Sequence, residues 1–203
     1  MKLYYMPGAC PLAAHIVLEW IGAPYEIAEV ERDKLQSPDY LKINPAGLVP
    51  ALVDGDLTLT ENIAILHYLA DLHPDKQLAG GSTPRGRAAV NRWLGFINSD
   101  LHQSFKPIFS PERFVSDASQ HAELVANASR KLRDLFALIN APLTRNDWLT
   151  GTTRSIADAY LFVVLRWARD KTVDLSGLDG LARFFQRMQA DPGARAAMKA
   201  EGL

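Results

Sequence analysis

Residues 44–60, NPAGLVPALVDGDLTLT, decide the fold. The first four of them form a turn signal, and two apolar runs, 48–53 and 57–59, follow. Asp54-Gly55-Asp56 separates the two runs, and this spacing predicts a β-hairpin because Asp and Gly tolerate positive φ. Pro50 opens the first strand, where a proline cannot donate a hydrogen bond to the strand ladder. The sequence therefore predicts an antiparallel strand pair that begins at a proline.

The segments before and after this hairpin alternate between strand and helix patterns. β-prone runs occupy 2–6 and 25–30, and helical apolar spacing occupies 12–21 and 61–73. Residues 38–43 can make one or two helical turns. The expected order is therefore β-α-β-α-β-β-α, which is the layout of a thioredoxin-like domain.

Almost everything after a polar linker is expected to be helical. Residues 74–84 are rich in proline and glycine and are typical of a linker. Helical patterns follow at 85–104, 116–139, 156–170, 180–189 and, briefly, 194–200. We therefore expect an α/β thioredoxin-like domain over 1–75 and an all-α domain over 85–203.

Composition excludes several classes of function. The 203 residues include 22 basic and 23 acidic side chains, so no basic field is available to hold nucleic acid. The longest strongly apolar run, 159–165, is too short to span a membrane, and Pro7 interrupts the N-terminus before a signal-peptide core could form. A single cysteine excludes an intrachain disulfide framework. We expect a soluble cytoplasmic protein that binds neither nucleic acid nor membrane.

Cys10 is the most informative single residue. It ends the first β-to-α turn, and Pro11 after it is favoured at the first position of a helix. Cys10 would then lie at the helix cap, where free N–H groups and the helix dipole lower a thiol pKa. The alternative is a small buried apolar residue. With no second cysteine, thiol exchange at Cys10 would need an external thiol such as glutathione.

Thr60-Glu61-Asn62 opens the helix over 61–73 and has two interpretations. Thr60 is a plausible N-cap, and an acid in the first turn suits the helix dipole. Alternatively, the free N–H groups take a ligand carboxylate while Glu61 takes a ligand ammonium. A γ-glutamyl group carries both charges on one carbon. Val49, before Pro50, could likewise pair its backbone with an extended ligand.

Other polar residues are assigned structural roles. The five histidines have no metal-binding spacing, so we expect no metal site. His15, His67, His73 and His121 are expected on helix surfaces or edges. Ser155 and Asp158 have the spacing of a capping box.

Several motifs together resemble the glutathione transferases over essentially the whole chain. They are Lys2-Leu3-Tyr4-Tyr5 through Pro7-Gly8-Ala9-Cys10, Asn44-Pro45-x-Gly47-x-Val49-Pro50-Ala51-Leu52, Leu59-Thr60-Glu61, Tyr68-Leu69-Ala70-Asp71, Leu101-His102 and Ser155-Ile156-Ala157-Asp158-Ala159-Tyr160. Pro-Gly-Ala-Cys together with Leu-His in the first helix of the second domain is similar to the bacterial beta class.

The resemblance implies a cytosolic transferase fold and a homodimer that uses glutathione as co-substrate, without a permanently bound cofactor. A hydrophobic electrophile would lie between the domains. Cys10 would face the glutathione sulfur, and His102 would reach the thiol from the helical domain. The implied glutathione-binding residues are Tyr5, Cys10, Lys34, Val49 before a cis Pro50, Glu61, Asn62, Ser99, Asp100 and His102.

This chain departs from the family pattern at five positions. Asn62 stands where serine or glycine is usual, and Pro11 where serine is usual. Gln103 replaces a common lysine, so one positive charge near the thiol is missing. The others are Gly95 in place of asparagine and Arg154 in place of an aromatic residue.

Three functions follow from these residues. The first is conjugation of glutathione to hydrophobic electrophiles in detoxification. The second is glutathione-dependent disulfide reduction, in which Cys10 attacks a glutathionylated substrate. The third is a non-catalytic interaction protein with a transferase fold. Cys10, Glu61 and His102 occurring together favour an enzyme.

Overall fold

The computed structural model describes all 203 residues. Its single sheet has the strand order β2-β1-β3-β4. The strands are β1 (Lys2–Tyr5), β2 (Glu26–Glu29), β3 (Ala51–Asp54) and β4 (Leu57–Thr60). β1 pairs in parallel with β2 and antiparallel with β3, and β3 pairs antiparallel with β4. The expected hairpin is confirmed, although β3 begins one residue after Pro50, and the Val49–Pro50 bond is cis.

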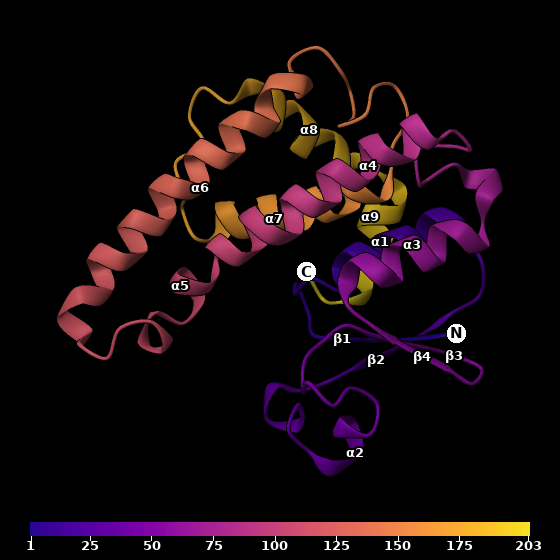
Figure 1. The fold of residues 1–203 in the computed structure, drawn as a ribbon, viewed down its shortest axis with the longest axis horizontal. Coiled ribbons are helices and arrows are strands. Elements are labelled where there is room, and N and C mark those ends of the chain that lie inside the picture. The colour runs from indigo at the N-terminus through magenta and orange to yellow at the C-terminus, as the bar shows by residue number, and fades with distance from the viewer.

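Three helices complete the N-terminal region. They are α1 (Leu12–Ile21), α2 (Pro38–Leu41) and α3 (Asn62–Leu72). Gly22 ends α1 with a φ of 76°, which glycine adopts without a steric cost. α1 and α3 lie on the side of the sheet that faces the other helices, and α2 lies beyond the opposite side (Figure 1). The β-α-β-α-β-β-α order of a thioredoxin-like domain is therefore confirmed.

The rest of the chain contains six α-helices, and they lie together on one side of the sheet region (Figure 1). They are α4 (Pro84–Phe96), α5 (Lys106–Phe109), α6 (His121–Leu143), α7 (Ile156–Asp170), α8 (Asp179–Ala190) and α9 (Pro192–Ala200). The helix expected over 116–139 begins later and ends later as α6. It follows a short 3₁₀ turn at Ala118–Gln120, which the side chain of Asp117 caps.

The helix expected over 85–104 is not continuous. α4 ends at Phe96, and a π-helical segment occupies Ile97–His102. The hydroxyl of Ser99 donates to the carbonyl of Gly95, and that of Ser104 donates to the carbonyl of Asp100. Such side-chain bonds to the preceding turn compete with regular α-helical bonding. A π-helical turn is frequently found at a functional site.

One buried apolar cluster joins the sheet region to the helical region. It runs from Leu3 on β1 to Ala197 on α9. α1 packs against α3, α7 and α9, so almost every α1 side chain is buried. Because both regions share this core, the division at 1–75 and 85–203 stays a prediction.

His15 corrects one expectation from the sequence. It is fully buried on α1 instead of lying at a helix surface. Its Nδ1 lies 2.9 Å from a carboxylate oxygen of Glu201, and its Nε2 lies 3.0 Å from the hydroxyl of Tyr25. These partners satisfy both ring nitrogens, which makes complete burial possible.

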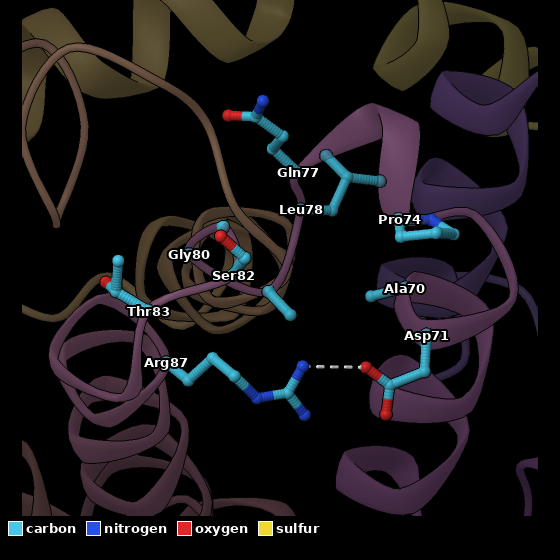
Figure 2. A pocket seen from close by; sticks show the side chains of 11 residues that line it. Ala70, Asp71, Pro74, Gln77, Leu78, Gly80, Ser82, Thr83 and Arg87 are labelled. Carbon is cyan, nitrogen blue, oxygen red and sulfur yellow. Dashed lines mark hydrogen bonds and ion pairs between the residues drawn. The ribbon is translucent and has the colours of Figure 1, made fainter.

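The linker between the regions encloses a cavity of about 520 Å³ (Figure 2). Arg87 on α4 and Asp71 on α3 face each other across it with an N–O distance of 3.0 Å. The hydroxyl of Thr83 accepts the N–H of Gly86 and so caps α4. Arg87 and Asp71 are thus paired with each other, and Thr83 caps the start of α4.

The capping box at α7 is confirmed, with Ser155 as the N-cap and Asp158 three residues later. The buried Asp158 carboxylate accepts bonds from the backbone of Leu149 and Ser155, and burial raises its pKa to about 6. No helix in the structure has the length and apolar character needed to cross a bilayer.

Candidate active site

A cavity of about 450 Å³ lies between the loop after β1 and the C-terminal half of α7. Residues from both regions line it, namely Met6, Pro7, Gly8, Ala9, Cys10, Arg32, Val49, His102, Phe109, Trp167, Asp170 and Lys171. Three of the residues expected from the sequence, Cys10, Val49 and His102, therefore meet in one place. The others lie outside the lining of this cavity.

Cys10 lies one residue further from α1 than expected. α1 begins at Leu12 with Pro11 as its N-cap, so Cys10 precedes the cap instead of occupying it. Its carbonyl accepts the N–H of Ala13 at 3.1 Å. Its thiol points the other way and donates to the carbonyl of Val49, with an S–O distance of 3.7 Å.

The expected lowering of the Cys10 pKa is wrong for this structure. Burial raises the pKa of the thiol to about 12, and the negative charge of Glu61 adds to the effect, although a backbone hydrogen bond opposes it. At neutral pH the thiol is therefore protonated. In this state Cys10 is a hydrogen-bond donor and a weak nucleophile.

Val49 presents an unused backbone group at the cavity. Its carbonyl accepts the thiol of Cys10, but its N–H has no hydrogen-bond partner in the protein. The next residue is the cis Pro50, and the strand ladder begins only at Ala51. A peptide-like ligand can therefore pair with this N–H.

His102 ends the π-helical segment, and its ring is held by a chain of hydrogen bonds. The hydroxyl of Tyr160 donates to the side-chain oxygen of Asn98 at 3.0 Å. The same hydroxyl lies 2.5 Å from Nδ1 of His102, so its oxygen accepts the Nδ1 proton. This pattern assigns the Nδ1–H tautomer and leaves the lone pair on Nε2.

The surroundings of His102 keep the imidazole neutral. Burial, followed by the positive charge of Lys106, lowers its pKa to about 4. The ring of Trp167 packs against it with centroids 4.8 Å apart, and the indole N–H of Trp167 donates to the carbonyl of Gly8 at 2.8 Å. At pH 7 the imidazole is thus in the neutral form, with Nε2 available as an acceptor, but a pKa of about 4 makes it a weak base, below the value that suits a general base at this pH.

Glu61 and Asn62 lie at the start of α3, close to Cys10. Glu61, and not the expected Thr60, is the N-cap, and its φ of 69° is uncommon for a residue other than glycine. Outliers of this kind concentrate at functional sites. Asn62 is 4% exposed, and neither polar atom of its amide has a partner at good hydrogen-bond geometry, although the amide lies near enough to the Tyr160 hydroxyl to oppose the rise that burial causes in the pKa of Tyr160.

Four expected site residues have other surroundings. Tyr5 is buried beside His15, with ring centroids 6.2 Å apart. Lys34 is exposed and lies 3.7 Å from Asp33. The hydroxyl oxygen of Ser99 lies 2.7 Å from a carboxylate oxygen of Asp100, which competes with the Gly95 carbonyl for its single proton. None of these four side chains lines the cavity.

The sequence did not predict five residues of the site. Tyr160 supports His102, and four residues line the cavity, namely Arg32, Phe109, Trp167 and Lys171. Tyr160 and Trp167 lie seven residues apart on α7, which places them on one helix face. Helical spacing from Tyr160 could have indicated Trp167. Arg32 lies in a 3₁₀ turn after β2, where the sequence carries no signal.

No group of three or more histidine, cysteine or acidic side chains in the structure is arranged to hold a metal ion. The titratable groups at the cavity instead suit proton transfer from a thiol, with His102 as acceptor.

Comparison with known proteins gives two family matches along the chain. The N-terminal domain of the glutathione S-transferases matches residues 1–71, and the C-terminal domain of the same family matches residues 98–192. A protein of Xanthomonas campestris pv. campestris named glutathione S-transferase GST-4.5 is 50% identical over 203 residues, which cover 100% of both chains.

Solved structures agree with these matches. A glutathione S-transferase from Xylella fastidiosa superposes with a TM-score of 0.96 at 46% identity, covering 100% of this chain and 98% of the other. A sphingomonad glutathione S-transferase complexed with glutathione gives 0.89 at 36% identity, and a bacterial beta class enzyme of Sphingomonas chungbukensis gives 0.89 at 37%. In both of these comparisons the two chains are covered completely.

Proposed function

This chain belongs to the glutathione S-transferase family, with beta-class enzymes among its structural neighbours, and we propose that it joins glutathione to hydrophobic electrophiles. One observation carries the proposal. A neutral imidazole with a free Nε2, on His102, lines the same cavity as the Cys10 thiol and the Val49 peptide. These groups can hold a thiol and remove its proton.

Glutathione is the proposed co-substrate, and no permanently bound cofactor is part of the proposal. The unpaired N–H of Val49 would bind the cysteinyl backbone of glutathione. Glu61 and the unpaired amide of Asn62 would hold the γ-glutamyl end at the start of α3. A similar sphingomonad transferase was solved with glutathione bound, which supports this choice.

The remaining expected ligands keep their predicted roles as proposals. Lys34 would bind the glycyl carboxylate after moving from Asp33, and Tyr5 would support the loop of Cys10. Ser99 and Asp100 would reach glutathione across a homodimer interface. We also propose a cytoplasmic, detoxifying role and a division into a glutathione-binding domain over 1–75 and a helical domain over 85–203.

The chemistry begins with the thiol of glutathione. Nε2 of His102 accepts the thiol proton, and the resulting thiolate forms a bond with the electrophilic carbon while the leaving group departs with its electron pair. The protonated Cys10 can donate a hydrogen bond to the thiolate sulfur, as it now does to the Val49 carbonyl. The electrophile would lie against Phe109 and Trp167.

Disulfide exchange through Cys10 ranks second. Exchange needs a thiolate, and burial raises the pKa of the Cys10 thiol, so that it is protonated at pH 7. Conjugation needs the cysteine only as a donor, so the same burial favours it. The observation in favour of exchange is that Cys10 lies beside Val49, whose free N–H would hold glutathione close to the Cys10 thiol.

The test is turnover of 1-chloro-2,4-dinitrobenzene with glutathione by the purified protein and by His102→Gln. We expect glutathione-dependent turnover that falls by about 10²-fold or more in the variant, the usual contribution of a general base. His121→Gln, on the surface of α6, is the matched control and should leave turnover unchanged.

Three results would contradict the proposal. Equal turnover by His102→Gln and the unaltered protein would remove the imidazole from the mechanism. No turnover with a broad electrophile panel, together with no calorimetric binding of glutathione, would instead favour the non-catalytic interaction protein. Disulfide reductase activity that vanishes in Cys10→Ser, without conjugation, would move exchange to first place.

A further inference from the structure

Three charged side chains line the mouth of the cavity. Arg32 comes from the 3₁₀ turn after β2, and Asp170 and Lys171 come from the C-terminal end of α7. None of the three takes part in an ion pair within 4.0 Å. Two cations and one carboxylate leave one net positive charge at the cavity.

The two cations reach the cavity from separate elements, and their unpaired state leaves both charges available to a ligand. A lysine at the end of a helix can be explained by the helix dipole, and this explanation covers Lys171. The helix dipole of α7 does not explain Arg32, which lies in a separate 3₁₀ turn and lines the same cavity.

An aromatic wall lies beside the cations. The rings of Phe109 and Trp167 meet edge to face with centroids 5.3 Å apart. Nζ of Lys171 lies 5.8 Å from the centroid of Phe109, so the charge and the ring border the same space. A planar ligand that carries a negative group can pack on these two rings and place its charge near the cations.

We propose that the preferred electrophiles are aromatic and carry an anionic group such as a carboxylate, which lies near Arg32 and Lys171 while the ring packs on Phe109 and Trp167. This inference rests on the proposed conjugation activity. With an aryl chloride, the glutathione thiol proton passes to His102, the sulfur bonds to the ring carbon, and chloride leaves with the electron pair of the carbon–chlorine bond.

Glutathione itself offers a second source of the same anion, because its glycyl end is a carboxylate. If Arg32 binds that end, its removal raises the KM for glutathione with every electrophile. If Arg32 and Lys171 bind the electrophile, their removal acts on anionic electrophiles and leaves the KM for glutathione unchanged. The two sources can therefore be separated by kinetics.

The experiment compares 1-chloro-2,4-dinitrobenzene with 4-chloro-3,5-dinitrobenzoate, which has a similar reacting ring and an added carboxylate. Arg32→Met and Lys171→Met should each lower kcat/KM for the benzoate by about fivefold, the upper range for an exposed charge pair, and change the neutral substrate less than twofold. High salt should reduce the difference. Asp170→Asn should raise kcat/KM for the benzoate.

Lys42→Met is the matched control, since Lys42 is an exposed cation that binds Asp39 outside the cavity. Equal effects of the cavity variants on both chlorides, or a raised KM for glutathione with both, would overturn the inference. Absence of turnover with the neutral chloride in the unaltered protein would instead overturn the proposed function, so the two failures are distinguishable.

Discussion

A carboxylate oxygen of Glu201 lies 2.9 Å from the backbone nitrogen of Gly8, although 193 residues separate them in the chain. The other oxygen of Glu201 contacts the buried His15. On the opposite side of the same glycine, the indole of Trp167 donates to its carbonyl. The helical region therefore holds both polar groups of Gly8, two residues before Cys10.

Glu201→Ala should destabilise the protein by about 3 kcal/mol, because it leaves His15 buried without its partner and removes the acceptor of the half-buried Gly8 N–H. We also expect kcat/KM to fall severalfold as the loop that carries Cys10 loses one of its two supports. Urea unfolding and turnover measure the two effects. Glu112→Ala, at an exposed position, is the control. An unfolding midpoint equal to that of the control would show that Glu201 does not hold the loop.

Tyr160→Phe should lower kcat/KM by about 10–100-fold, as is typical when a group that orients a catalytic ligand is removed. Without the hydroxyl, nothing accepts the Nδ1 proton of His102, and the ring can place its proton on Nε2. Tyr160 is thus a positioning residue that acts through His102.

Ring-nitrogen chemical shifts of ¹⁵N-labelled histidine distinguish this effect from general damage. They should report the Nδ1–H tautomer in the unaltered protein and a mixture in Tyr160→Phe. Tyr4→Phe is the matched control, because the hydroxyl of Tyr4 makes no hydrogen bond within the protein. An unchanged tautomer with reduced turnover would mean that Tyr160 supports the fold alone.

These networks mark the limit of what the sequence could predict. Cys10 and His102 belong to short motifs, so they could be found without a structure. Arg32 and Lys171 reach the cavity from elements 139 positions apart, and no local pattern joins them. A helix terminus lowers a thiol pKa, which is the only effect that the local sequence predicts for Cys10; burial and the charge of Glu61 raise the pKa and dominate.

The fold shows the same division between local and tertiary effects. Turn residues and apolar spacing were sufficient for the sheet and for α1, because each signal lies within a few residues. The π-helical segment at 97–102 was missed because apolar periodicity does not detect serine side chains that bond to the preceding turn. His15 was assigned to a surface because its partner, Glu201, lies at the far end of the chain.

Acid should weaken the protein through His102. Its pKa is about 4 in the folded chain and 6.5 in the unfolded chain, so between these values the unfolded chain binds the extra proton. The contribution of His102 to stability should therefore fall as the pH drops from 6.5 to 4, by at most about 3.4 kcal/mol, and level off below. Urea unfolding across this range, compared with His102→Gln, isolates the contribution. Parallel curves for the two proteins would contradict it.

Asn62→Ala should have opposite effects on stability and on binding. The amide of Asn62 is buried near the Tyr160 hydroxyl without a well-formed hydrogen bond, a state that costs at most about 1–3 kcal/mol. Its removal should leave the unliganded protein as stable as before or more stable. Glutathione affinity should fall about tenfold, because one ligand hydrogen bond is worth roughly 1.4 kcal/mol.

Urea unfolding with and without glutathione measures both effects of Asn62→Ala, since a ligand stabilises the folded state in proportion to the logarithm of its concentration over Kd. Asn91→Ala, at an exposed position of α4, is the control and should change neither quantity. Loss of stability with unchanged glutathione affinity would assign Asn62 to the fold. If Asn62→Ala keeps or raises the free energy of unfolding and lowers the affinity for glutathione, Asn62 serves binding. A residue that only supports the fold would lower the free energy of unfolding when it is removed.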